Sequence, residues 1–389
     1  MQLIEKKAYL EHYTEYCEKL KAKTLLRALP KQSQKKIIAD FSTSDYLGLS
    51  QNLVIINSAI EHAKKWGTSS RASRLLSGNL EIFTELERKI AKCKNTEEAL
   101  ILNSGFVGNA TVIAALLNKQ VLKDTPLVFC DKLIHASSHL GIQIAGATHI
   151  KYKHLDMNHL ESLLQEHQHS PNPKFIFSET VFSMDGDVID IEAIIFLAKK
   201  YNAFLYLDEA HDIGVFGENG YGLTHKYSQD IDCILGSFSK ALGCFGGYIA
   251  CSKELKKYLV NKCGGFVYSS ALPPMVIGAV TKAWDELPKL NNIRSSIFEN
   301  AKYLRDKLQS FRIDIGNSST QIIPIILKGE QEALHLQSYL SQNGILASAI
   351  RPPSVPPKQS RIRLSICAEQ SSSQIDYLLQ LLVPYDKRD

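Results

Sequence analysis

Short apolar segments alternate with helix-like segments through the middle of the chain. Five of them have the length and the β-branched or aromatic content of buried strands: ALILN (99–103), PLVFC (126–130), KFIFSET (174–180), AFLYLDEA (203–210) and CILGSFSK (233–240). Strands that are apolar on both faces and alternate with helices predict an α/β fold, with a mostly parallel sheet covered on both sides. Functional side chains are then expected at the carboxyl ends of the strands.

The pattern changes near Ala271. Six further elements are predicted there: a helix in ALPPMVIGAVTKAWDEL, a helix over 297–308, a strand in QIIPIILKG, a helix in LHLQSYLSQNG, the strand RIRLSI and a helix near 373–382. This order indicates a smaller α+β domain. We therefore predict an N-terminal helix and arm at 1–44, a large domain at 45–280 and a small C-terminal domain at 281–389.

Composition excludes several classes of protein. Apolar residues make up 44% of the chain and charged residues 22%, which is typical of a globular protein. The net charge of +5 comes with no recognition motif, so we expect no nucleic-acid partner. No apolar run reaches the length of a membrane span or a secretory signal, so we expect no membrane partner and a cytoplasmic location. The eight cysteines form no CxxC pair, which favours reduced, small apolar side chains.

Asp208 and Lys240 stand at the ends of two successive strand-like runs. Taken alone, Asp208 fits a helix cap equally well, and Lys240 fits a solvated end charge. In neighbouring parallel strands, however, both side chains would point into one crevice. A desolvated lysine forms imines with carbonyl groups, and an acid opposite it pairs with a protonated pyridine nitrogen. The pair therefore predicts a site for pyridoxal 5'-phosphate.

Other residues fit the same cofactor. The segment NSGFVGN (103–109) predicts a strand, a turn and a helix start whose free amides bind an anion. Hydroxyl groups for a phosphate are available at Ser237, Ser239, Ser269 and Ser270, although an ordinary turn explains each of them as well. His135 could stack on a flat ring, and His211 could contact the same ring. The remaining histidines at 149, 154, 159, 167 and 169 are expected at the surface.

No metal site is predicted. His135 and His139 have the i, i+4 spacing of a metal-binding pair, but no third ligand stands near them in the sequence.

Taken in order, nine segments resemble the α-oxoamine synthases, a family of fold-type I pyridoxal phosphate-dependent transferases. They are DYLGLS, SRLLSGN, NSGFVGN, HAS, FSMDGD, LDEAH, SFSKALG, GGY and YSSALPP, and the likeness runs from residue 45 to residue 366. The resemblance implies a large domain with a mostly parallel central sheet, a smaller C-terminal α+β domain and a homodimer. The loop AIRPPSVPPKQSRIRLSI is similar to that of the biotin-pathway branch.

The resemblance also implies a role for each matching residue. Lys240 would bind the cofactor as a Schiff base and move the Cα proton, while Asp208 pairs with the pyridine nitrogen. His135 would stack on the ring, with His211 and Ser183 at its phenolic oxygen. The implied phosphate contacts are Gly105, Phe106 and Ser237, with Ser269 and Ser270 reaching the partner subunit's phosphate. The implied substrate contacts are Arg27, Ser44, Arg351 and Ser354.

The reaction implied by the resemblance is a decarboxylative condensation of L-alanine with a pimeloyl thioester, carried on acyl carrier protein or coenzyme A. Two alternatives are another α-oxoamine synthase, forming 2-amino-3-ketobutyrate or a signalling α-aminoketone, and a non-catalytic homologue. Two departures from the family pattern bear on the substrate. Ser44 replaces an asparagine, which leaves more of the carboxylate binding to Arg351, and Arg71-Ala72 replaces small residues in a glycine-rich loop.

Overall fold

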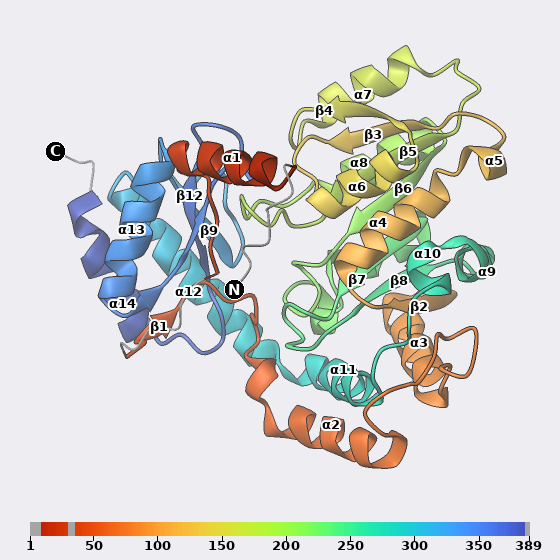
Figure 1. The fold of residues 1–389 in the computed structure, drawn as a ribbon, viewed down its shortest axis with the longest axis horizontal. Coiled ribbons are helices and arrows are strands. Elements are labelled where there is room, and N and C mark those ends of the chain that lie inside the picture. Colours follow the sequence, from red (N-terminus) through yellow and green to blue (C-terminus); the bar gives the residue numbers. More distant parts are fainter. Residues whose placement is uncertain (1–8, 30–35, 386–389) are drawn as a thin grey trace, which may run out of the picture.

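The computed structural model describes residues 9–29 and 36–385, so part of the predicted N-terminal arm lies outside the described residues. In this part of the chain, Figure 1 shows a larger lobe built on a seven-stranded sheet and a smaller lobe built on a three-stranded sheet. The large sheet has the order β2-β8-β7-β6-β5-β3-β4. Its strands are β2 (Glu98–Leu102), β3 (Leu127–Asp131), β4 (Thr148–Tyr152), β5 (Lys174–Glu179), β6 (Ala203–Asp208), β7 (Cys233–Ser237) and β8 (Gly247–Cys251).

The predicted α/β class and mostly parallel sheet are confirmed. Strands β4, β3, β5, β6 and β7 pair in parallel, so the ends of β6 and β7 lie side by side. The sequence did not predict two strands. β4 reads THIKY and is largely exposed along its length, while β8 follows the turn after Lys240 and runs antiparallel to both β7 and β2.

Side chains alternate between the two faces of this sheet, because successive residues of a strand point in opposite directions. In β6, Leu205 and Leu207 belong to one apolar core, and Tyr206 belongs to the other. The first core also receives α3 (Glu81–Lys94), α7 (Met157–Glu166), α8 (Ile191–Lys200) and α11 (Pro274–Glu286). The second receives α4 (Gly105–Leu116), α6 (Ala136–Ile144), α9 (Lys253–Lys262) and α10 (Gly264–Val267).

The smaller lobe contains the predicted helices and strands in the predicted order, together with β10 and β11, which the sequence did not predict. Its antiparallel sheet runs β11 (Ser348–Ile350), β12 (Arg361–Ser365) and β9 (Ile322–Ile326). The helices of this lobe are α12 (Asn291–Ser310), α13 (Glu330–Gln342) and α14 (Ser372–Leu382). β1 (Ala39–Asp40) pairs in parallel with β10 (Ile345–Leu346), which attaches the segment before residue 45 to this lobe.

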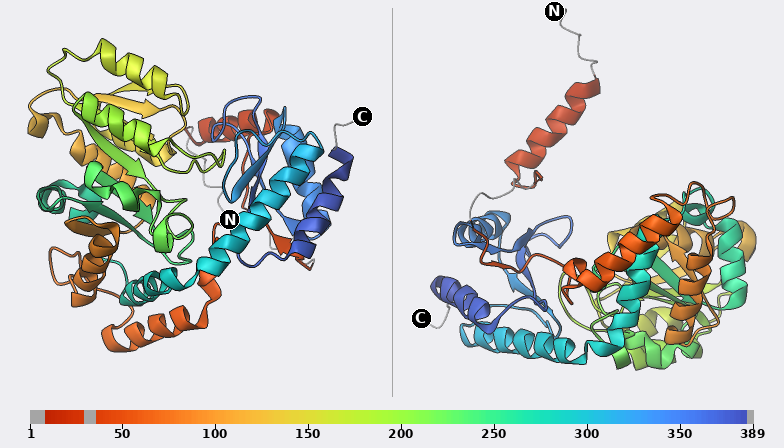
Figure 2. Two further views of the ribbon diagram at one scale, coloured as in Figure 1. Left: turned by 180° about the vertical axis from the view of Figure 1, so that it is seen from behind. Right: turned by 90° about the horizontal axis from the view of Figure 1, so that it is seen from below.

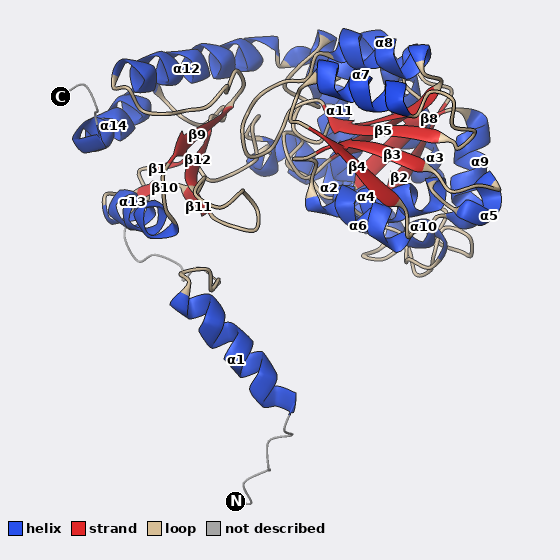
Figure 3. Ribbon diagram, turned by 90° about the horizontal axis from the view of Figure 1, so that it is seen from above, coloured by secondary structure: helices blue, strands red, loops and turns tan. Residues whose placement is uncertain are grey.

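Three helices complete the chain. α2 (Leu53–Trp66) packs against α11, and the short α5 (Lys119–Leu122) precedes β3. α1 (Tyr9–Ala22) projects away from both lobes in Figure 2 and Figure 3, and none of its described residues is buried. Across the described ranges, no helix combines the length and the apolar character needed to span a bilayer.

His154 is not a surface residue, so that expectation was wrong. Its ring lies between Asp131 and Asp187, with Nδ1–Oδ1 and Nε2–Oδ2 distances of 2.9 Å each, and its side chain is only 15% exposed. Burial alone would lower the pKa of His154, but the hydrogen bonds and charges of the two carboxylates outweigh it and raise the pKa to about 10. A protonated His154 therefore joins the end of β3 to the turn that contains Ser183.

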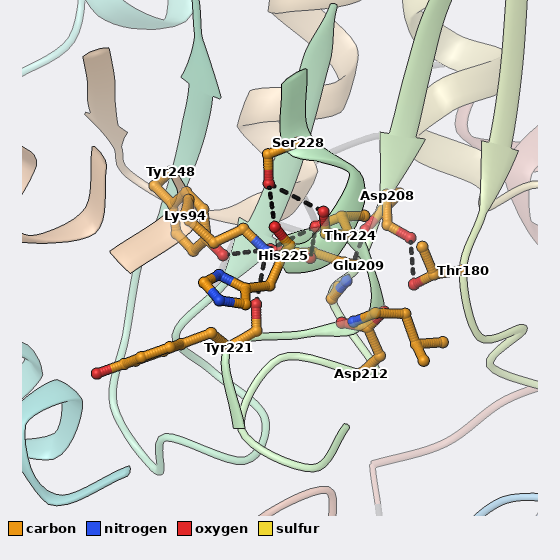
Figure 4. A network of polar contacts seen from close by, with 12 residues as sticks. Lys94, Thr180, Asp208, Glu209, Asp212, Tyr221, Thr224, His225, Ser228 and Tyr248 are labelled. Carbon is orange, nitrogen blue, oxygen red and sulfur yellow. Dashed lines mark hydrogen bonds and ion pairs between the residues drawn. The ribbon is translucent and has the colours of Figure 1, made fainter. Parts of the chain in front are cut away.

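A buried ion pair lies behind the end of β6 (Figure 4). The side chains of Lys94 and Glu209 are both 0% exposed, and Lys94 Nζ lies 2.8 Å from Glu209 Oε2. The same ammonium group donates to the Tyr221 carbonyl and to Thr224 Oγ1, each at 2.6 Å. Tyr248 donates its hydroxyl to the other oxygen of Glu209. All three protons of Lys94 are used, so the pair is fully hydrogen-bonded in spite of its burial.

Replacing Lys94 tests how much this pair contributes. We expect Lys94→Ala to lower the free energy of unfolding by about 3–5 kcal/mol, because Glu209 would be left as an uncompensated buried charge. Lys199→Ala is the control, since the Lys199–Asp230 pair is largely exposed and should change stability by about 1 kcal/mol or less. Urea unfolding of both variants gives the comparison, and equal losses would contradict a special contribution from the buried pair.

Candidate active site

A cavity of about 180 Å³ opens at the carboxyl ends of β5, β6 and β7. It lies where a parallel sheet is expected to bind ligands. Eight residues that the sequence analysis selected line it, together with others that it did not select. The lining residues are Ser104, Gly105, Phe106, Asn109, His135, Ser137, Glu179, Asp208, Ala210, His211, Leu235, Ser237, Ser239 and Lys240.

Asp208 is the buried acid of this cavity. Its position in β6 gives it the same direction as Tyr206, toward α4, and there Oδ2 accepts a hydrogen bond of 2.6 Å from Asn109 Nδ2. Oδ1 accepts from the backbone N–H of Ala210 at 2.9 Å. Burial raises the pKa of Asp208, and the hydrogen bonds from Asn109 and Ala210 oppose this shift. Asn109 is itself fixed, because Tyr206 donates its hydroxyl to Asn109 Oδ1 at 2.7 Å.

Lys240 lies just beyond the end of β7, next to the strand that contains Asp208. Its pKa is lowered, first by burial and then by the positive charge of Arg363, while the charge of Asp208 acts in the opposite direction, as a charge on Glu179 would. A lower pKa leaves more of the amine unprotonated, which is the nucleophilic form.

The first turn of α4 supplies an anion site beside these two residues. Ser104 caps the helix by accepting from Val107 N at 3.1 Å, so the start of α4 is well defined. A Cβ atom built on Gly105 would lie 3.4 Å from Cβ of Ser237, so a side chain there would crowd that end of the cavity. Ser237 and Ser239 place their hydroxyl oxygens 2.8 Å apart beside it. Helix amides and hydroxyls of this kind suit a phosphate group.

Two histidines complete the wall. His135 caps α6, and its Nδ1 lies 2.6 Å from Ser137 Oγ. Its pKa is lowered by burial. His211 Nδ1 lies 2.8 Å from the hydroxyl of Tyr46, which accepts a hydrogen bond of 3.0 Å from Arg363 Nη2. Burial, and then the positive charges of Lys240 and Arg363, hold the pKa of His211 well below its usual value, so this ring is neutral.

Seven of the predicted site residues do not line this cavity, and four of them are Ser44, Ser183, Ser269 and Ser270. Ser183 lines a separate cavity together with Ser354, and its carbonyl accepts a hydrogen bond of 2.6 Å from Arg363 Nε. Ser269 and Ser270 meet Asn103 instead, with Asn103 Nδ2 lying 2.6 Å from Ser269 Oγ. Ser44 accepts from the backbone of Tyr46 at 2.9 Å through its carbonyl. The roles predicted for these four serines stay predictions.

The three remaining substrate residues come together elsewhere. Arg27 Nη2 donates to Ser354 Oγ at 3.0 Å, and Arg351 Nη1 donates to the carbonyl of Thr24. Arg27 and Arg351 line a groove of about 1110 Å³ between the segment that follows α1 and the smaller lobe. The structure thus brings Arg27, Arg351 and Ser354 together, but outside the cavity of Lys240. Burial and the neighbouring Arg27 lower the pKa of Arg351.

Arg71, one of the departures from the family pattern, has a backbone φ of 68°. This is the left-handed region that glycine adopts without steric cost. The backbone at Arg71 therefore takes a glycine-like conformation although the residue has a side chain.

Sequence reasoning missed four residues of the site: Tyr46, Asn109, Glu179 and Arg363. Three of them lie inside segments that had been singled out, namely DYLGLS, NSGFVGN and RIRLSI. The fourth, Glu179, ends the strand KFIFSE directly beside Asp208. The pattern that identified Asp208, an acidic residue at the end of a buried strand, could also have identified Glu179.

The side chains fit pyridoxal phosphate. A buried lysine of lowered pKa, a hydrogen-bonded acid next to it and a helix start with two hydroxyl groups supply the donors and acceptors that the cofactor requires. Within the described ranges, no group of three or more His, Cys, Asp or Glu side chains is arranged to hold a metal ion.

Comparison with known proteins gives three kinds of match. The family model described as aminotransferase class I and II matches residues 36–382. A protein from Gluconacetobacter diazotrophicus named 8-amino-7-oxononanoate synthase is 42% identical over 347 residues, which cover 89% of this chain and 87% of that protein.

Solved structures show the same fold. A crystal structure of 8-amino-7-oxononanoate synthase from Francisella tularensis superimposes with a TM-score of 0.78 at 26% identity, covering 90% of this chain and 97% of that one. A serine palmitoyltransferase from Sphingomonas wittichii gives a TM-score of 0.85 at 24% identity, covering 99% and 98% of the two chains.

Asn109 offers a test of how Asp208 is held. We expect Asn109→Ala to lower the free energy of unfolding by about 1–3 kcal/mol at neutral pH, because the Tyr206 hydroxyl and the Asp208 carboxylate both lose a buried partner. The loss of unfolding free energy should shrink at acidic pH, because a protonated Asp208 depends less on the hydrogen bond from Asn109. Urea unfolding at several pH values measures this. Asn261→Ala, which removes an exposed side chain, is the control and should change little. A loss that does not depend on pH would contradict the proposed support of the charged form.

Arg363 offers a test of the pKa of Lys240. Removing its positive charge in Arg363→Gln should raise the pKa of Lys240 by roughly one unit. In the cofactor-free protein, the rate at which pyridoxal phosphate attaches to Lys240, trapped by borohydride, should then reach half its maximum at higher pH. Arg351→Gln lies outside the cavity and should leave this midpoint in place. An unchanged midpoint in Arg363→Gln would show that Arg363 does not control the charge on Lys240.

Proposed function

The chain belongs to the aminotransferase class I and II family, and from this premise we propose that it acts as an α-oxoamine synthase that joins L-alanine to a pimeloyl thioester. This is a pyridoxal phosphate-dependent C-acyl transfer with loss of carbon dioxide, the reaction of 8-amino-7-oxononanoate synthases in biotin biosynthesis. The observation that carries the proposal is the pair formed by Asp208 and Lys240 in one buried cavity. The likeness to a named synthase over 89% of the chain supports the choice of branch.

The residues of the cavity divide the work of holding the cofactor. Lys240 would bind it covalently, and Asp208 would pair with its ring nitrogen. His135 would lie against the ring, while the first turn of α4, Ser237 and Ser239 would hold the phosphate. When bound, pyridoxal phosphate supplies an electron sink for negative charge at the Cα atom of the amino acid.

The residues also control protons. Lys240, with its lowered pKa, is suited to take the proton from Cα of L-alanine and to return one later. Asp208 stays close to two hydrogen-bond donors that favour its charged form, so it can keep a ring nitrogen protonated. His211 is neutral and is oriented by Tyr46, so it can exchange hydrogen bonds with a ring oxygen without adding positive charge.

The groove of Arg27 and Arg351 supports an anionic substrate. In the hydrogen bonds described for these two guanidinium groups, the acceptors are a serine hydroxyl and a backbone carbonyl, both neutral. In the described structure neither guanidinium group forms an ion pair, although the charge of Glu330 acts on Arg351, so both are suited to a carboxylate or phosphate group. We propose that they bind an anionic group of the amino acid, the intermediate or the acyl thioester.

A homodimer is also part of the proposal. Tyr268 is 90% exposed and Phe106 is 51% exposed, beside Ser269 and Ser270 at the edge of the site. Large exposed aromatic side chains at this edge support a second subunit there. Ser269 and Ser270 would then complete the phosphate site of the partner subunit.

The test is turnover by the purified chain with pyridoxal phosphate, L-alanine and pimeloyl thioester, supplied in separate reactions on acyl carrier protein and on coenzyme A. We expect carbon dioxide, free thiol and 8-amino-7-oxononanoate in equal amounts. Lys240→Ala should lower turnover by about 10²–10⁴-fold, because the proton transfer at Cα loses its base. The exposed Lys199→Ala is the control.

Two results would change the assignment. Preference for glycine or L-serine over L-alanine would keep the family and move the chain to another α-oxoamine synthase. If pyridoxal phosphate attaches to Lys240 and no acyl thioester is consumed with any amino acid, the proposed reaction is wrong.

A further inference from the structure

Glu179 is a second buried acid in the cavity. It closes β5 at the position that pairs with Asp208 of β6, so the two acidic residues stand side by side at the same edge of the sheet. The alternation of side chains points both toward α4 and α6, because Phe175 and Phe177 of β5 and Tyr206 of β6 belong to that core. Glu179 is only 3% exposed and lines the same cavity as Lys240.

The carboxyl of Glu179 has fewer hydrogen-bond donors than the carboxyl of Asp208. The backbone N–H of His135 lies near the carboxyl of Glu179 and acts to lower the pKa of Glu179, but burial outweighs it. Its Oε1 is buried and has no hydrogen-bond partner among the described residues. Asp208, in contrast, has a donor on each oxygen, Asn109 on one and Ala210 on the other. A carboxylate accepts hydrogen bonds only, so the oxygen with no donor favours a protonated Glu179.

The surrounding charges point the same way. Asp208 and the more distant Asp131 disfavour a negative charge on Glu179, while His154 favours one. Lys240 lies across the cavity, within the electrostatic range of Glu179. Two adjacent buried carboxyls do not both ionise readily, and the better hydrogen-bonded one takes the charge. In agreement, burial and then Asp208 raise the pKa of Glu179 well above its usual value.

We propose that Glu179 is an uncharged positioning residue, which holds the backbone of His135 at the start of α6 and leaves Asp208 as the ionised carboxyl of the cavity. Glu179 caps no helix and forms no salt bridge in the described structure, so its burial has no other evident purpose. A second negative charge here would stabilise the protonated form of Lys240. An uncharged Glu179 therefore preserves the reactive amine while it fixes the residue predicted to stack on the cofactor. The link to the cofactor rests on the proposed function, but the charge and the position of Glu179 do not.

The charge is tested on the cofactor-free protein by thermal unfolding of the wild type and Glu179→Gln between pH 5 and pH 9. A carboxyl whose pKa is higher in the folded state gives stability at low pH and loses it as the pH rises toward that folded pKa. Glutamine does not titrate, so we expect the Tm of Glu179→Gln to rise relative to the wild type by about 1–2 °C per pH unit. The exposed Glu166→Gln is the control and should show a constant difference.

The opposite trends would overturn the proposal. A Tm difference that is constant with pH, or that falls as the pH rises, would show that Glu179 is ionised in the folded protein. A measurement on the wild type keeps the test valid even if the variant does not fold. Infrared spectra of cofactor-free wild-type protein with isotope-labelled glutamate should show the C=O band of a protonated carboxyl at pH 7. Absence of that band would also overturn the proposal.

The positioning of His135 is tested by comparing Glu179→Gln with Glu179→Leu. Glutamine still offers a carbonyl oxygen to the His135 amide, and leucine does not. We expect hydrogen exchange at the start of α6 to speed up in Glu179→Leu only, with affinity for pyridoxal phosphate about 10-fold weaker, the effect of one lost hydrogen bond. If Gln and Leu behave alike in both measurements, Glu179 does not position His135. Neither measurement requires turnover, so failure here is separate from failure of the proposed reaction.

Discussion

The site depends on the way β6 ends. Successive strand residues point to opposite faces, so Asp208 is directed toward α4 and Glu209 toward α3. On one side Asn109 holds the acid that faces the cavity, and on the other Lys94 holds its neighbour in a fully hydrogen-bonded ion pair. Two adjacent acids are thus fixed from both faces of the sheet, and rotation of this strand end would break both sets of contacts. The position of Asp208 is therefore set by the core and not by the ligand.

Acidic and basic side chains lie near one another along this edge of the sheet. Asp131, Glu179 and Asp208 close three neighbouring strands, and His154, Lys240 and Arg363 lie against them from other elements. Such groups are costly to bury unless they are paired or uncharged. His154 is charged because two carboxylates hold it, and His211 is neutral because it is buried and, to a lesser extent, because Lys240 and Arg363 lie near it. The same residue type thus takes opposite charge states within one fold, each fixed by its neighbours.

The sequence was enough to predict the features that repeat or that end an element. Apolar runs located most of the sheet, and the acid and lysine that follow two of them identified the cavity. The sequence did not predict β8, which follows the turn after Lys240 and runs antiparallel. It also did not predict β4, because the polar residues of THIKY do not resemble a buried strand. Asn109 meets Asp208, Tyr46 meets His211 and Arg363 meets Tyr46, in each case from segments far away in the chain. Only the packing of α4 and of the smaller lobe on the sheet brings them there. No local sequence pattern predicts these contacts.

The smaller lobe contributes to the chemistry although the cavity lies in the larger one. Arg363 in β12 donates to the carbonyl of Ser183 and to the hydroxyl of Tyr46, which in turn orients His211. The same positive charge lowers the pKa of Lys240. Arg351 directly follows β11, the strand that pairs with β12, and lines the groove proposed to bind an anion. A shift of this lobe would therefore move Arg351, which is proposed to bind substrate, and change the charge on Lys240 together. Binding an anionic substrate in the groove and preparing Lys240 for reaction would then be one event.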